Sequence, residues 1–458
     1  MAGNAPAQQR SAFEHTAPGK RPKNVRAAFW AAAAILVIAI AFGGGGSKYG
    51  FANLIVQLTA LAALAFNRHA FFDFWSTAPL ALRGLVGLSI LLPLLYVIPV
   101  PASIWNALPG RELMVQSLEL VEANDWATVS VNPLRTLLAL SAIITPLALL
   151  AIGWSAPRDR LITAGWVVVG LGLVNLFIGI PQVLTNSEVG VLYPENPMPG
   201  VLFGTFANRN STGLFLVAAL ALAALLPIPE RFAKAGVAIR IVTCLLLIVA
   251  VILTRSRTAL VLALIPVGMV SLQLLTARGV LRGWLALAPF AVVALAIASL
   301  VVLAPGRVGD TLERFEGAGD NPRAYIWDDA LYTTDRYWPV GAGTGSFDDV
   351  FQIDESLENM TPLRARRAHN DYLEVAVEAG VPGLVLIAGW LLLLIWLSWR
   401  ARNARDRWIA WSGAVILLAI ALQSITDYPL RNQSLLAVGS FALLILARFG
   451  ASRRETGR

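Results

Sequence analysis

The stretch RARRAHNDYLEVAVEAGVPGLVLIAGW, residues 364–390, places three arginines, a histidine and an aspartate directly ahead of a long apolar run. About 20 consecutive apolar residues are enough for a helix to cross the hydrocarbon core of a bilayer. Charged side chains are costly at that depth unless they are paired or face a polar cavity. The stretch therefore predicts a membrane-spanning helix whose entrance carries a polar site.

The composition of the whole chain agrees with a membrane protein. Of its 458 residues 57% are hydrophobic and only 14% are charged, whereas soluble domains are about a quarter charged. The net charge of +8 does not indicate a nucleic-acid partner, because the basic residues lie between apolar runs and form no patch on a soluble domain. The single cysteine, Cys244, lies within an apolar run, which excludes a disulfide and a cysteine metal site.

Apolar windows predict an all-α polytopic membrane protein with about 12 transmembrane helices. One large extracytoplasmic loop is expected between the ninth and tenth spans. The predicted spans cover residues 27–43, 51–66, 84–100, 134–154, 161–180, 212–228, 241–254, 258–276, 283–305, 380–399, 408–425 and 432–448.

The same windows divide the chain into five parts. The polar and basic residues 1–26 are typical of a disordered cytoplasmic tail. Their length before the first apolar run argues against a cleaved signal peptide, so the first run is expected to be a retained span. The remaining parts are spans one to nine in 27–305, a periplasmic loop in 306–379, spans ten to twelve in 380–448 and a cytoplasmic tail in 449–458.

The distribution of lysine and arginine predicts the orientation. With the N-terminus inside, the inner segments hold 22 basic residues, and the short outer segments hold 7. Because short cytoplasmic loops are enriched in basic residues, both termini are expected in the cytoplasm. Arginines that fall on the outer side against this rule are candidates for function.

Two arginine motifs lie on the predicted outer side. FANRNSTGLF places Arg209 before the sixth span, where Ser211 or Asn210 is expected to cap a helix whose free N–H groups suit an anion. LTRSRTAL places Arg255 and Arg257 at a corner between two helices, at the level of lipid headgroups. Guanidinium groups bind phosphate there with two parallel hydrogen bonds. The alternatives are an ordinary capped helix and arginines that anchor to lipid.

The histidine motif AHNDYLEVAVEAG follows the cluster RARR. Asn370 or Asp371 is expected to cap a short helix, and His369 and Tyr372, three residues apart, share a face if this helix starts early. His369 is the only histidine on the predicted outer side, and the functional interpretation makes it a general base near a pyrophosphate site. The alternative is a hydrated loop histidine.

Other motifs suggest no metal and no cofactor. GAGTGSF, residues 341–347, resembles a phosphate-binding loop but lacks the Lys-Ser/Thr ending, so a structural turn is expected. The two Asp-Asp pairs at 328–329 and 348–349 have no histidine near them, which disfavours a metal site. GGGGSKYG, from Gly43, is expected to be a flexible outer turn.

Taken together, GTFANRNSTGLFL, LTRSRTALVLALI, RAYIWDDAL with GAGTGSF, and AHNDYLEVAVEAGVPGLVL resemble the O-antigen ligase and polymerase superfamily of bacterial membrane glycosyltransferases. These segments lie between about residues 200 and 400, while the first 200 residues match no motif of the family. The resemblance implies an enzyme of the cytoplasmic (inner) membrane whose active site faces the periplasm.

The resemblance also implies the reaction and its residues. A glycan carried on undecaprenyl diphosphate would be moved to a saccharide acceptor, without ATP and without metal. The motif match makes His369 the catalytic residue. The candidate substrate-binding residues are Arg209, Arg255, Arg257, Arg323, Arg367, Asn370 and Asp371.

Three other functions stay open at this point. The motifs do not separate an O-antigen ligase from a Wzy-type O-antigen or exopolysaccharide polymerase of the same family. A polysaccharide flippase or transporter also suits about twelve spans, although the two halves show no internal repeat. A peptidoglycan polymerase of the shape and division class shares the many spans and the large outer loop.

Overall fold

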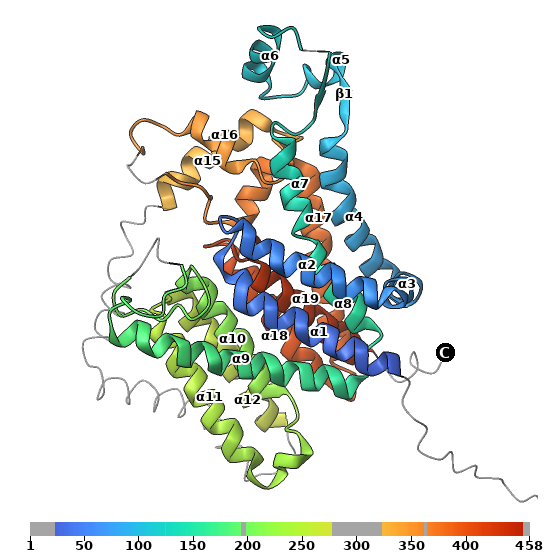
Figure 1. The fold of residues 1–458 in the computed structure, drawn as a ribbon, viewed down its shortest axis with the longest axis vertical. Helices are drawn as coiled ribbons and strands as arrows, with labels where there is room; N and C mark the ends of the chain where they lie inside the picture. The colour runs from blue at the N-terminus through green and yellow to red at the C-terminus, as the bar shows by residue number, and fades with distance from the viewer. Residues whose placement is uncertain (1–22, 124, 194–197, 277–322, 361–363, 452–458) are drawn as a thin grey trace, which may run out of the picture.

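A computed structural model describes residues 23–451 except residue 124 and the ranges 194–197, 277–322 and 361–363 (Figure 1). The predicted ninth span at 283–305 lies outside the described residues, as do most of the N-terminal tail and the first part of the predicted large loop. Figure 1 shows the described chain as an assembly of helices.

The N-terminal half contains the helices α1 to α9 and one small antiparallel sheet, in which Val100 pairs with Ala127. Its elements are α1 (Lys23–Phe42), η1 (Gly43–Gly45), α2 (Gly50–Phe66), α3 (Arg68–Thr77), α4 (Leu80–Val97), β1 (Pro99–Pro101), α5 (Ala102–Trp105), α6 (Glu112–Glu119), β2 (Trp126–Thr128), α7 (Pro133–Ser141), α8 (Ile144–Trp154) and α9 (Arg158–Leu184).

The chain from α10 onward carries the arginine and histidine motifs. Its described elements are α10 (Arg209–Leu225), η2 (Glu230–Ala235), α11 (Gly236–Leu253), α12 (Arg257–Thr276), α15 (Arg323–Tyr337), α16 (Phe347–Asp354), α17 (Asp371–Ala401), α18 (Arg407–Gln423), η6 (Pro429–Arg431) and α19 (Gln433–Phe449).

Seven helical segments in the described chain are long and apolar enough to cross a membrane. The pair α2 and α3 makes an eighth if the two are one span bent by 82°. The helices α10, α18 and α19 are apolar but shorter. The prediction of an all-α polytopic membrane protein is therefore confirmed at this level, and each predicted span outside 277–322 overlaps one or two of these helices.

The shorter apolar helices form the centre of the bundle. Every residue of α10 from Ser211 to Leu225 is buried, with α9, α11, α12 and α18 packed around it. A helix that is apolar on all sides is stable in such a position, because no face of it needs to meet water. This central packing fixes the start of α10, where the Arg209 motif lies.

Two peripheral groups lie together at one end of the molecule (Figure 1). The small sheet with α5 and α6 forms one group, and α15 with α16 forms the other. Arg111 joins them: its buried guanidinium donates to Gly341 O at 3.0 Å and stacks 5.3 Å from the ring centre of Tyr337. Arg111 thus ties the segment between β1 and α6 to the segment between α15 and α16.

The expected flexible turn at Gly43 is wrong. Gly43 and Gly44 are buried in η1, and a side chain at Gly44 would come within 2.2 Å of Thr205 O. Asn432 also donates to Gly44 O at 3.0 Å. The glycines are there because the turn packs directly against the backbone before α10 and the start of α19.

Candidate functional site

Four turns that are far apart in the sequence meet at one place. They are the start of α10, the corner between α11 and α12, the residues before α17, and the turn between α18 and α19. Asn210 joins three of them: Ser256 donates to its side-chain oxygen at 2.9 Å, and Gln423 donates to its backbone oxygen at 3.0 Å. The structure thus brings the separate sequence motifs into one site.

His369 lies against the turn between α18 and α19. Its Nδ1 is 3.4 Å from Oδ1 of Asp427, and its ring centre is 5.0 Å from that of Tyr428. The side chain of His369 is 33% exposed, whereas that of Asp427 is 3% exposed. A buried carboxylate beside Nδ1 orients the imidazole and leaves Nε2 for another partner.

The carboxylate of Asp427 is held in its charged form. Burial raises the pKa of Asp427, but the hydrogen bond and charge of His369, the charge of Arg323 and a hydrogen bond from Asn210 together leave it below its ordinary value. Burial raises the pKa of Tyr428 to about 12, so its phenol stays protonated. Arg323, a predicted binding residue at the start of α15, therefore lies close enough for its charge to lower the pKa of Asp427.

The start of α10 differs in detail from the prediction. Asn208, and neither Ser211 nor Asn210, caps this helix, since its side chain accepts from Asn210 N at 2.8 Å. The Nδ2 of Asn208 also lies 3.4 Å from Oδ2 of Asp427. Arg209 is the first residue of the helix, so the predicted position of this arginine at a helix N-terminus is confirmed.

The corner with Arg255 and Arg257 is confirmed. Helix α11 ends at Leu253 and α12 begins at Arg257, which leaves three residues for the turn. Arg255 has φ 52° and His369 has φ 51°. Such left-handed conformations cost about 1–3 kcal/mol for residues other than glycine and occur most often at functional sites.

The shared face expected for His369 and Tyr372 is wrong. Helix α17 begins at Asp371, and Asn370 caps it by accepting from Tyr372 N and Leu373 N at 3.0 and 3.1 Å. His369 therefore precedes the helix. Tyr372 turns away and donates to Ala421 O at 2.8 Å.

A second group of charged side chains lies in the same region as His369 and Asp427. Its members form ion pairs with one another. Arg431 lies 3.8 Å from Asp371, 3.2 Å from Glu374 and 2.7 Å from Glu378, and these three carboxylates are almost fully buried in α17. Arg367 adds a 2.6 Å pair with Glu374. We call these five residues the Arg431 cluster.

Asp371 and Arg367, two predicted binding residues, belong to this cluster. Asp371 also accepts from the hydroxyl of Ser424 at 2.9 Å and from Leu430 N at 3.2 Å. Burial lowers the pKa of Arg431, but its three carboxylate neighbours outweigh this and raise it above the ordinary value. The cluster therefore fixes α17 to the turn that presents Asp427 to His369.

Helix α17 is broken at Gly380, which has φ 52° and ψ −141°. A side chain there would lie 2.1 Å from Pro339 O. The GAGTGSF loop compensates for the break, since Ala342 N and Gly343 N donate to the carbonyls of Val377 and Glu378 at 2.9 and 2.7 Å. The structural turn expected for this loop is confirmed, and it caps the first part of α17.

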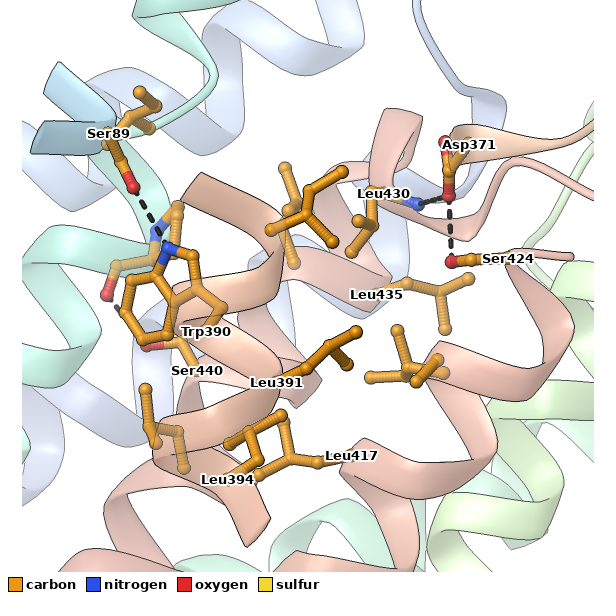
Figure 2. A pocket seen from close by; sticks show the side chains of 18 of the residues that line it. Ser89, Asp371, Trp390, Leu391, Leu394, Leu417, Ser424, Leu430, Leu435 and Ser440 are labelled. Carbon is orange, nitrogen blue, oxygen red and sulfur yellow. Dashed lines mark hydrogen bonds between the residues drawn. The ribbon is translucent and has the colours of Figure 1, made fainter. Parts of the chain in front are cut away.

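An apolar groove opens next to Asp371 (Figure 2). Its volume is about 380 Å³ and its walls come from α4, α8, α17, α18 and α19. Leu391, Leu394, Leu417 and Leu435 line it in Figure 2, and Asp371 lies at one end. The groove suits an aliphatic ligand with a polar end.

Two residues of this site were not predicted from the sequence. Asp427 and Tyr428 stand in the segment TDYPLRNQ, between the last two predicted spans. A signal was present, because an acidic residue between two apolar spans is costly without a partner. The partner, His369, lies in another motif, and the pairing became visible only in the fold.

Comparison with known proteins gives one family. Residues 242–388 match the family model described as O-antigen ligase (Wzy_C). The match contains Arg255, Arg257, Arg323 and His369, while Arg209 and Asp427 lie outside it. No curated protein matches the chain.

Proposed function

We propose that the chain moves a glycan from undecaprenyl diphosphate to an acceptor sugar, on the premise that residues 242–388 match the O-antigen ligase family. The family is one of glycosyl-transferring enzymes of surface polysaccharide biosynthesis in bacterial membranes. The observation that carries the proposal is the His369–Asp427 pair where the two arginine turns meet. Neither nucleotide nor metal has a part in the proposed reaction.

The donor already contains a good leaving group, provided that its negative charge is held. Arg209 begins α10, and Arg255 and Arg257 flank the neighbouring corner. Guanidinium groups bind phosphate oxygens in pairs, and the positive end of the α10 helix dipole adds to this attraction. These groups would stabilise the charge that develops on the diphosphate in the transition state.

His369 would act as the general base. With Nδ1–H directed at Asp427, Nε2 is free to take the proton from the acceptor hydroxyl. The hydroxyl oxygen forms a bond to the anomeric carbon while the bond to the diphosphate breaks. The diphosphate leaves with that electron pair, and Asp427 stabilises the protonated imidazole.

The surroundings of His369 fit a transfer from which water must be excluded. Helix α15 reaches the histidine motif, since the indole N–H of Trp327 donates to Ala368 O at 2.8 Å. Coverage of this kind disfavours hydrolysis of the donor. The apolar groove beside Asp371 would take part of the isoprenoid chain.

In the proposed orientation both termini are cytoplasmic and the site faces the periplasm. The test uses single cysteines at two exposed positions, Glu358→Cys between α16 and α17 and Asn403→Cys between α17 and α18, each with Cys244→Ser. A membrane-impermeant thiol reagent should label the first in cells with a permeabilised outer membrane. Labelling of the second alone would reverse the orientation.

The activity is tested with purified protein in detergent, lipid-linked glycan and acceptor. Wild-type protein should transfer the glycan. The Arg255→Ala/Arg257→Ala variant and Arg209→Lys, which keeps the charge but loses the planar fork, should be impaired. Full activity in both would make these arginines lipid anchors.

A deletion strain separates ligase from polymerase. Long chains that stay on the lipid carrier, with no glycan on the acceptor, are expected for the loss of a ligase. Single repeat units on the acceptor would instead make the protein a polymerase of the same family.

A further inference from the structure

Two amide side chains are buried in α9, a helix that is long and apolar enough to cross a membrane. Asn175 is 1% exposed and Gln182 is fully buried. They are seven residues apart, which is close to two helical turns, so they lie on one face of α9. Polar side chains inside the apolar part of a membrane protein are costly unless they are paired, and they often serve function. The hydrogen-bonding partners of these two amides therefore indicate what they do.

Both amides bind the backbone of one short segment ahead of α10. Oε1 of Gln182 accepts from Phe203 N at 2.9 Å and from Gly204 N at 2.8 Å, and its Nε2 donates to Gly204 O at 3.0 Å. Oδ1 of Asn175 accepts from the backbone N–H and the hydroxyl of Thr205 at 2.8 and 3.0 Å. This segment belongs to no helix or strand, so its buried N–H groups need partners from elsewhere. Helix α9 supplies them for three successive residues.

The segment that α9 holds, residues 202–205, is also bonded to the corner that carries Arg255. Leu202 N donates to Leu253 O at 3.0 Å. Leu253 is the last residue of α11 and stands two positions before Arg255. A shift of the segment would therefore displace the end of α11 and the arginine corner that follows it.

At its other side the segment is bonded to the start of α10, which begins with Arg209. The hydroxyl of Thr212, in the first turn of α10, donates to Phe203 O at 2.9 Å. The contact with α9 is tight, since Gly204 has φ 57° and a side chain there would come within 2.2 Å of Oδ1 of Asn175. The segment thus connects both arginine turns of the candidate site and is itself fixed to α9.

We propose that Asn175 and Gln182 are positioning residues for the diphosphate: by holding residues 202–205 they fix the spacing between Arg209 and Arg255. Two guanidinium groups bind one diphosphate with paired hydrogen bonds only when their separation and orientation are fixed. Both amides are buried and paired with backbone, so they act through that backbone. The proposal rests on the proposed glycosyl transfer and extends its machinery to α9, which lies outside the match to the family model.

Direct binding of the lipid diphosphate is the first test. Undecaprenyl diphosphate is the probe, and native mass spectrometry of the purified protein in detergent measures its affinity. Asn175→Leu and Gln182→Met lose the acceptor oxygens at similar size and should each weaken binding about tenfold, because small displacements of binding groups have effects of this order. Asn175→Asp and Gln182→Glu keep an oxygen for the backbone N–H groups and should restore most of the affinity.

The matched control is Trp166→Phe on the same helix. The indole N–H of Trp166 donates at 2.9 Å to the carbonyl of Pro227, which follows the end of α10. The control therefore also removes a hydrogen bond from α9 to a segment next to α10, but at the end opposite to Arg209. It should bind the probe as the wild type does.

Thermal unfolding in detergent shows which variants are folded, and Asn175→Leu and Gln182→Met serve as substitutes for each other. Equal affinity in a folded variant of this pair and in the control contradicts the proposal. So does an isosteric variant, Asn175→Asp or Gln182→Glu, that is folded and yet binds as weakly as its apolar counterpart.

Transfer kinetics separate positioning from a loss of folded protein. Asn175→Leu and Gln182→Met should raise KM for the lipid-linked donor about tenfold and leave KM for the acceptor unchanged, because the arginines hold the diphosphate alone. A smaller number of folded molecules would lower the apparent kcat and change neither KM. An equal rise of both KM values would therefore contradict a role at the diphosphate.

The two proposals fail in different ways. If the wild type binds undecaprenyl diphosphate and the apolar variants weaken this binding, but no glycan is transferred, the proposed reaction is wrong and the positioning role stands. If the wild type transfers glycan and both folded variants bind the lipid as Trp166→Phe does, only the positioning role is wrong. Absence of lipid binding by the wild type overturns the diphosphate site and, with it, the positioning role.

Discussion

Asp427 and Arg431 are four residues apart in the same turn, yet their surroundings differ. Arg431 is closed in by three carboxylates from α17. Asp427 faces His369, whose side chain is one-third exposed, and otherwise neutral amide groups such as that of Asn208. A charge that is fully paired holds elements together, whereas a carboxylate that faces an accessible imidazole leaves that imidazole able to accept a proton. The turn thus has a structural end and a reactive end.

The largest expected effect on stability is at the structural end. Arg431→Met leaves three buried carboxylates with Arg367 as their remaining partner, and should cost roughly 3–5 kcal/mol. Thermal unfolding in detergent should show this loss. Arg135→Met removes an arginine whose side chain is 44% exposed and should cost at most about 1 kcal/mol.

A charge-balancing variant sharpens this result. Adding Glu378→Gln to Arg431→Met should recover part of the lost stability, because Glu378 pairs with Arg431 and not with Arg367, so the double variant no longer holds this buried charge without its partner. If the double variant is less stable than Arg431→Met, the cost does not come from unpaired buried charge.

At the reactive end, the expected effect is on rate. Asp427→Asn removes the negative charge that stabilises the protonated imidazole and should lower kcat about 100-fold, within the range typical of general-base catalysis. Because the amide has nearly the same shape, the melting temperature should change much less than in Arg431→Met. A large loss of stability with normal kcat would make Asp427 structural as well.

The smallest expected effect is on stability in acid. The pKa of Asp427 in the folded protein is below its ordinary value, which is about 3.9 in the unfolded chain. Its ionised form therefore contributes stability above that pH, and the contribution is lost as the pH falls through the folded pKa. The difference in melting temperature between wild type and Asp427→Asn should shrink from pH 5 to pH 3. A difference that grows in acid contradicts this charge assignment.

Much of the helical bundle was predictable, because an apolar run can be recognised from consecutive residues without knowledge of the fold. Each predicted span outside 277–322 overlaps an apolar helix, and the corner at Arg255 was placed correctly. The break at Gly380 was not predictable, since it depends on the approach of Pro339 and on the loop at Gly343. The cap at Asn208 was missed because neighbouring Asn and Ser residues all suit that position.

The candidate site was predictable only in part, because some of its residues stand in local motifs and others are brought together only by the fold. Arg209, Arg255 and His369 stand in local motifs, so they could be singled out. The pairing of His369 with Asp427 and of Asp371 with Arg431 joins segments that are separated by α17 and α18. Sequence spacing carries no signal for such pairs, and this is why the roles of Asp427 and Arg431 appeared only in the fold.

The central claim, that His369 removes the proton from the acceptor, is tested most directly by the transfer rate of His369→Gln. Glutamine can hydrogen-bond to the acceptor but cannot take its proton. With purified protein, lipid-linked glycan and acceptor, kcat should fall at least about 100-fold, while elution from size-exclusion chromatography and donor binding stay unchanged. Turnover at the wild-type rate would contradict proton abstraction by His369 and leave it only the task of positioning the acceptor.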